Sequence, residues 1–103
     1  MATTEGEFKL KVFKVLRTFP RMWFFKTQLV AIVGIPDVIG VCNGHFFAWE
    51  LKKEDGKASK VQLSTLKKIN KAGGTAHVVR PSNLDDCANS LMRKAFPQRI
   101  ENA

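Results

Sequence analysis

The sequence predicts one mixed α/β domain over residues 1–103, with a mixed four-stranded sheet flanked by helices in the order α-β-β-β-α-β-α. Apolar residues recur with helical spacing in three segments, at the two ends and in the middle of the chain. Two apolar, strand-like runs flank Asn43-Gly44, the strongest short hairpin signal, because a type I′ turn needs positive φ at both central residues. A helical segment then leads to one more strand, as in a parallel crossover.

The first helix is expected from about residue 5 to Phe19. Thr4-x-x-Glu7 resembles a capping box, and Pro20 ends the helical pattern. The apolar residues with helical spacing are Phe8, Val12, Val15, Leu16 and Phe19.

Three strands follow. Met22 to Gln28 is aromatic and strand-like, and Leu29 to Ile35 is an irregular approach to Pro36. The strands Asp37–Cys42 and His45–Lys52 then form the hairpin. For Trp23, Phe24 and Phe25 we favour a central strand buried on both faces, or a dimer interface, over stacking on bases.

The second half of the chain supplies two helices and the fourth strand. Ser59-x-x-Gln62 is a second capping box and opens a helix that Gly73-Gly74 ends. The fourth strand is Thr75–Arg80, and the last helix runs from about Leu84 to Phe96. The middle helix is expected to turn Val61, Leu63, Leu66 and Ile69 toward the core. The apolar positions of the last helix are Leu84, Cys87, Leu91 and Phe96.

Charge favours a polyanionic partner. Seventeen Lys and Arg residues against nine acids give a net charge of +8, which points to nucleic acid first and an acidic membrane surface second. A basic surface that only maintains solubility is the plain alternative. No apolar run approaches the roughly 20 residues that span a bilayer, and the N-terminus lacks a signal-peptide core, so an intracellular (cytoplasmic) location is expected. Cys42 and Cys87 suit reduced, buried thiols.

The hairpin brings two acids together. A symmetric two-residue turn pairs Cys42 with His45, which places Asp37 directly across from Glu50, with Lys52 on the same face. Directly opposed like charges destabilise a sheet, and a divalent cation resolves that conflict. A metal would polarise a phosphate oxygen, and Lys52 would orient the attacking water or neutralise developing charge. A plain salt-bridge cluster is the alternative.

The two acids and Lys52 belong to a longer series of motifs along the chain. Gly34-Ile35-Pro36-Asp37, Glu50-Leu51-Lys52, Gln62 early in the next helix and Gly73-Gly74 before the next strand resemble the VRR-NUC (virus-type replication-repair nuclease) domain of the PD-(D/E)XK nuclease superfamily. The resemblance runs from about Glu7 to Arg80. It implies a PD-(D/E)XK restriction-endonuclease-like core and a metal-dependent DNA endonuclease that hydrolyses phosphodiester bonds, with Mg²⁺ or Mn²⁺ as cofactor.

The resemblance also implies roles for individual residues. Asp37, Glu50 and the backbone carbonyl of Leu51 would bind the metal, and Lys52 would be the catalytic lysine. Gln62 matches a glutamine near the metal site, although capping by Ser59-x-x-Gln62 explains it as well. Family members carry an acid in the first helix, and Glu7 is our choice, with its capping-box role an equally good explanation.

The partners follow from the same resemblance. Stand-alone relatives are similar to Holliday-junction resolvases and act as homodimers, so we expect branched or junction DNA as substrate, a role in replication or repair in a bacterial or phage-infected cell, and a homodimer. Lys53, Lys57 and Lys60 become candidate phosphate contacts. Two rival interpretations are a non-catalytic nucleic-acid-binding module with the same fold and a small structural or oligomerisation protein.

Overall fold

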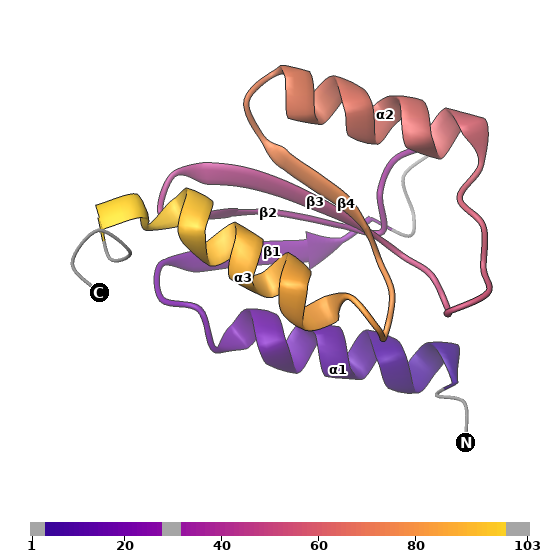
Figure 1. Cartoon of the computed structure of the whole chain (residues 1–103), viewed down its shortest axis with the longest axis horizontal. Helices are drawn as coiled ribbons and strands as arrows, with labels where there is room; N and C mark the ends of the chain where they lie inside the picture. Colours follow the sequence, from indigo (N-terminus) through magenta and orange to yellow (C-terminus); the bar gives the residue numbers. More distant parts are fainter. Residues whose placement is uncertain (1–3, 28–31, 99–103) are drawn as a thin grey trace.

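The computed structural model describes residues 4–27 and 32–98, and its elements follow the predicted order (Figure 1). The chain alternates a helix, three strands, a helix, a strand and a helix. The elements are α1 (Glu5–Arg17), β1 (Met22–Lys26), β2 (Val38–Cys42), β3 (His45–Leu51), α2 (Lys60–Lys71), β4 (Thr75–Val79) and α3 (Leu84–Ala95).

The sheet is mixed and has the strand order β1-β2-β3-β4. The first two pairings are antiparallel, and β3 pairs with β4 in parallel across the helical connection. Asn43 and Gly44 have φ of 49° and 81°, as the predicted type I′ turn requires. Cys42 pairs with His45 and Val38 with Trp49, so the predicted register is confirmed.

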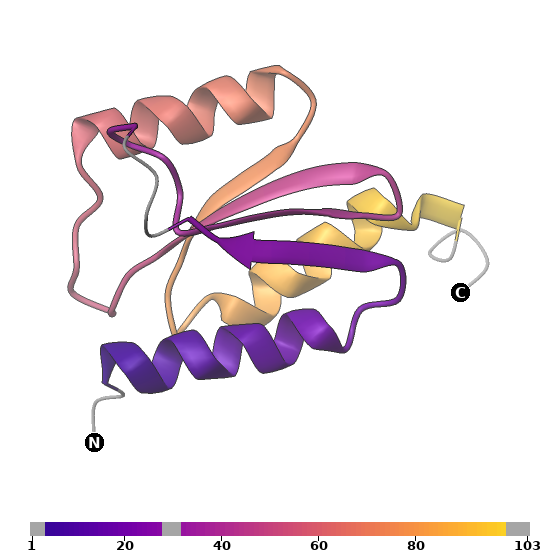
Figure 2. The same ribbon diagram turned by 180° about the vertical axis from the view of Figure 1, so that it is seen from behind.

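Helices cover both faces of the sheet. α1 and α3 lie on one face and α2 on the other (Figures 1 and 2). The larger core lies under α1 and α3 and includes the buried side chains Phe8, Leu16, Phe47, Trp49 and Leu91. A smaller cluster under α2 is built on Ala48, Leu66 and Ala76.

The prediction of which α2 side chains face the core is partly wrong. Leu66 is buried, but Val61 and Leu63 are 48% and 50% exposed. Leu66 and Ile69 contact the sheet over β3 and β4, while Leu63 lies elsewhere around the helix. Because the sheet side chains under this helix include Ala48 and Ala76, a narrow apolar stripe is enough to cover them.

The central-strand interpretation of the three aromatics is also wrong. β1 is an edge strand, and Trp23 and Phe25 are 61% and 41% exposed on the face that carries α2. Phe24 points the other way and stacks on Phe13 of α1, with ring centroids 5.9 Å apart. The alternation of side chains along the strand is as predicted, but the second face, which was predicted to be buried, is exposed at Trp23 and Phe25.

The strand ends differ slightly from the predicted ones. β1 ends at Lys26, and Gln28 and 29–31 lie outside the described residues. Asp37 directly precedes β2, and Lys52 directly follows β3. Cys42 and Cys87 are buried free thiols, as expected. Within residues 4–27 and 32–98, no helix has the length and apolarity to cross a bilayer.

A pair of leucine substitutions tests these packing assignments. Leu91→Ala removes a fully buried side chain of the larger core and should lower the free energy of unfolding by about 2–5 kcal/mol. Leu63→Ala changes the same atoms at a half-exposed position and should cost less than about 1 kcal/mol. Urea denaturation measures both, and equal losses would contradict the observed packing of α2.

Candidate metal and nucleic-acid site

Asp37 is held at the entrance to β2 by two elements. The backbone N–H of the buried Thr27, just after β1, donates to the Asp37 carbonyl at 3.0 Å, and the Thr27 hydroxyl donates to the Pro36 carbonyl. From β3, the Leu51 N–H donates to Asp37 Oδ2 at 2.8 Å. The hydrogen bond to Leu51 therefore fixes the carboxylate across the sheet from the end of β3.

Glu50 is buried at the end of β3, with 2% of its surface exposed. Its Oε2 atom lies 3.4 Å from Lys52 Nζ and accepts a hydrogen bond of 2.9 Å from Gln62 Nε2. Its Oε1 atom is buried and has no hydrogen-bond partner in the described part of the chain. A buried carboxylate oxygen without a partner costs stability, so Oε1 is the candidate ligand atom of this site.

The two carboxyls influence each other. Burial, and then the negative charge of the neighbouring Asp37, raise the pKa of Glu50 from 4.5 to about 7, while Lys52 opposes the shift. The shared face predicted for Asp37, Glu50 and Lys52 is consistent with this proximity. At neutral pH, ionising both acids is unfavourable unless a further cation lies beside them.

Gln62 caps α2 and also contacts Glu50. Its Oε1 accepts from the Ser59 N–H at 2.8 Å, which completes the capping box of α2. Its Nε2 donates to Glu50. The capping geometry orients the side chain, so the start of α2 is tied directly to the buried carboxylate.

Two substitutions separate these roles. Ser59→Ala removes the cap and should lower the free energy of unfolding by about 1 kcal/mol while leaving the Glu50 contact in place. Gln62→Ala removes both interactions and should in addition lower metal affinity or activity by about 10- to 100-fold, as for residues that orient a metal ligand. Thermal melting with and without Mg²⁺ measures both; identical metal responses would show that Gln62 is only a cap.

Glu7 belongs to the capping box at the start of α1. Its N–H donates to Thr4 Oγ1 at 3.1 Å and its Oε1 accepts from the Thr4 N–H at 3.4 Å, so the capping-box interpretation is confirmed. Among residues 4–27 and 32–98, no hydrogen bond or ion pair joins Glu7 to the other site residues, and its role as a metal ligand stays a prediction. The role of the Leu51 carbonyl also stays a prediction, while the Leu51 N–H contacts Asp37.

The three loop lysines lie beside the site on one exposed segment. Lys53, Lys57 and Lys60 are exposed and lie between the end of β3 and the first turn of α2. The segment begins directly after Lys52 and ends two residues before Gln62, and its lysines face solvent, which suits contacts to a phosphate backbone.

Arg80 organises this segment, a role that the sequence analysis missed. Its Nη1 donates to the carbonyls of Lys53 at 2.7 Å and Glu54 at 3.3 Å, and to that of Gly56. The signal was available, because parallel pairing of β3 and β4 brings the residues after both strands to one edge.

The donor set fits a hard divalent cation. Asp37 and the unpartnered oxygen of Glu50 are carboxylate ligands of the kind that Mg²⁺ prefers, and Mg²⁺ is commonly held by one or two carboxylates with the rest of its shell left to water and phosphate. No three His, Cys, Asp or Glu side chains converge as a metal-binding group among the residues described. The site thus offers a two-carboxylate centre.

Comparison with protein-family models, with curated proteins and with solved structures finds no match for this chain. The fold and site define a mixed α/β domain with the buried Glu50, the half-buried Asp37, a lysine and a glutamine at one end of its sheet.

Proposed function

We propose that the chain is a metal-dependent DNA endonuclease with a PD-(D/E)XK core of the VRR-NUC type, acting on branched or junction DNA. The observation that carries the proposal is Glu50: a buried carboxylate with one oxygen unpartnered, beside Asp37 and in contact with Lys52 and Gln62. A buried glutamate beside a second acid lowers stability, and a bound cation would compensate for that cost.

Asp37 and Glu50 would hold Mg²⁺ or Mn²⁺, which supplies Lewis-acid polarisation of phosphate and a lowered pKa of water. The chain's other groups act around this pair. Lys52 is partly exposed, at 24% of its side chain, so its ammonium group is able to meet substrate and stabilise charge that develops at phosphorus. Gln62 and the Leu51 N–H fix the orientations of the two carboxylates.

The exposed lysines support DNA as the substrate. Lys53, Lys57 and Lys60 would contact backbone phosphates beside the carboxylate pair, and such contacts position a strand without reading its sequence. Together with the net charge of +8, they favour binding that weakens steeply with salt and varies little with sequence.

A homodimer is part of the proposal, because paired cuts in a junction need two sites. Its support is a row of exposed apolar side chains across three strands: Trp23 of β1 pairs with Val41 of β2, which pairs with Phe46 of β3. Association of two copies would remove such a row from water. Sedimentation equilibrium at assay concentration measures the mass, and a monomer that still makes paired cuts would remove this part of the proposal.

The test is cleavage of a labelled four-way junction, a linear duplex and a single strand of matched sequence. Wild type and Lys52→Ala are incubated with Mg²⁺, Mn²⁺ or EDTA. We expect metal-dependent, paired cuts in the junction that EDTA and the substitution both suppress.

Three other results of this cleavage assay would change the proposal. Cleavage of all three substrates would keep the nuclease and remove the preference for junctions. DNA binding with no turnover under either metal would replace the nuclease by a non-catalytic binding module. Cleavage that persists in EDTA would contradict the metal-dependent mechanism.

A further inference from the structure

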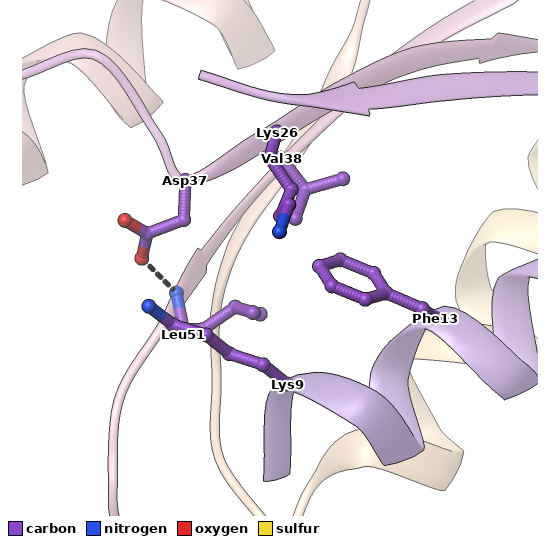
Figure 3. A pocket seen from close by; sticks show the side chains of 6 residues that line it. All are labelled: Lys9, Phe13, Lys26, Asp37, Val38 and Leu51. Carbon is purple, nitrogen blue, oxygen red and sulfur yellow. Dashed lines mark hydrogen bonds between the residues drawn. The ribbon is translucent and has the colours of Figure 1, made fainter. Parts of the chain in front are cut away.

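A second group of charges lies on the α1 side of Asp37. A cavity of about 20 Å³, room for about one water molecule, opens between α1 and the adjacent ends of β1, β2 and β3 (Figure 3). Its lining consists of Lys9, Phe13, Lys26, Asp37, Val38 and Leu51.

Two of these residues are cations from different elements. Lys9 is half-buried and its side chain reaches from α1 toward the carboxylate of Asp37 (Figure 3). Lys26, at the end of β1, has its Nζ 5.5 Å from the centre of the Phe13 ring, a cation–π contact that holds the ammonium group over α1.

Neither Lys9 nor Lys26 forms an ion pair with another residue that the structure describes. Within residues 4–27 and 32–98, the one ion pair joins Lys52 to Glu50. Asp37, the only acid in the cavity lining, has its Oδ2 bonded to the Leu51 N–H. Two lysines against one acid leave an excess of positive charge around the cavity, which attracts an anionic group at its opening.

Asp37 joins this cavity to the candidate metal site. Lys52 and Gln62 approach Glu50 at the α2 end of the acidic pair, whereas Lys9 and Lys26 approach Asp37 from the α1 side. A DNA strand whose scissile phosphate lies at the acidic pair would therefore meet cations on both sides of it.

We propose that Lys9 and Lys26 bind a backbone phosphate of the strand being cut, next to the scissile one and on the side of the site away from Lys53, Lys57 and Lys60. This inference rests on the proposed nuclease function and adds to it the direction in which the strand crosses the site. The first helix then contributes a cation at Asp37, through Lys9, while its acid Glu7 serves as the helix cap.

The experiment compares Lys9→Gln, Lys26→Gln and the double variant with wild type. Lys14→Gln is the matched control: the same charge change on the same helix, at an exposed residue outside the cavity lining. DNA affinity is measured by fluorescence anisotropy over a KCl series with Ca²⁺ in place of Mg²⁺, and single-turnover cleavage is measured with Mg²⁺.

Each single cavity variant should weaken binding roughly five- to tenfold, equally for different sequences, and the double variant should lower the slope of log affinity against log salt by about 1 relative to the control. Lys9→Arg should restore the affinity lost in Lys9→Gln. The Mg²⁺-induced rise in melting temperature should persist in all of them, since neither lysine binds the metal.

Affinity, salt slope and cleavage rate of the double variant equal to those of Lys14→Gln, with an active wild type, would overturn the inference and leave the nuclease standing. A wild type that neither binds nor cleaves DNA would overturn both. If Lys26→Gln destabilises the fold through its lost contact with Phe13, Lys9→Gln and Lys9→Arg still decide the question.

Discussion

Replacing Glu50 by glutamine should stabilise the metal-free protein at pH 8 and abolish its cleavage of DNA. Glutamine keeps the shape of the side chain and the hydrogen bond from Gln62, while it removes a buried charge next to Asp37. Because residues selected for a site are often unfavourable for the fold, stability and activity should change in opposite directions.

The size and pH range of the effect follow from the raised pKa. The folded state binds the Glu50 proton more tightly than the unfolded state, so this carboxyl contributes no change below about pH 4.5 and lowers stability as the pH rises toward about 7. A shift from 4.5 to about 7 corresponds to about 3 kcal/mol at pH 8. Between pH 4.5 and pH 8, the free energy of unfolding of wild type should therefore fall by that amount relative to Glu50→Gln.

Chemical denaturation at a series of pH values, in EDTA, measures the difference. Asp55→Asn, a neutralised acid on the exposed loop, is the control and should show no comparable gain. Mg²⁺ should raise the melting temperature of wild type more at pH 8 than at pH 5, because the metal displaces the proton, and should leave Glu50→Gln unchanged. Equal stability of wild type and Glu50→Gln across this range would contradict the charge conflict at the acidic pair.

Lys52→Ala should slow single-turnover cleavage by about 10²–10³-fold, the loss typical of removing one group that stabilises transition-state charge. Its ammonium group lies 3.4 Å from Glu50 and is partly exposed, so it is positioned at the acidic pair and open to substrate. The metal-induced rise in melting temperature should remain, since Lys52 is not a ligand.

Lys68→Ala is the control, the loss of an exposed lysine further along α2, and should cleave at nearly the wild-type rate. Rapid quench under saturating enzyme measures both variants. A Lys52→Ala protein as fast as Lys68→Ala would assign Lys52 to a structural ion pair only.

The acidic pair was predictable because its geometry is local. Asn43-Gly44 fixes the turn, the turn fixes the register, and the register fixes which residues oppose each other. Both capping boxes were predictable for the same reason, since each joins residues three positions apart.

The features that sequence did not reveal depend on contacts between distant elements. The exposure of Leu63 depends on how α2 lies on the sheet, and the edge position of β1 depends on strand order. Lys9, Lys26 and Arg80 carry no pattern of their own. They gain significance only from neighbours brought by packing: Asp37 for the two lysines and the loop after β3 for the arginine.

The most direct test of the central claim is a crystal structure of the protein with uncleavable junction DNA and Mn²⁺, with anomalous data collected near the manganese edge. We expect an anomalous peak in contact with both Asp37 and Glu50, and a DNA phosphate beside it. Bound DNA with no peak at these carboxylates, and Glu50 still paired only with Lys52 and Gln62, would contradict the assignment of this site as a metal centre.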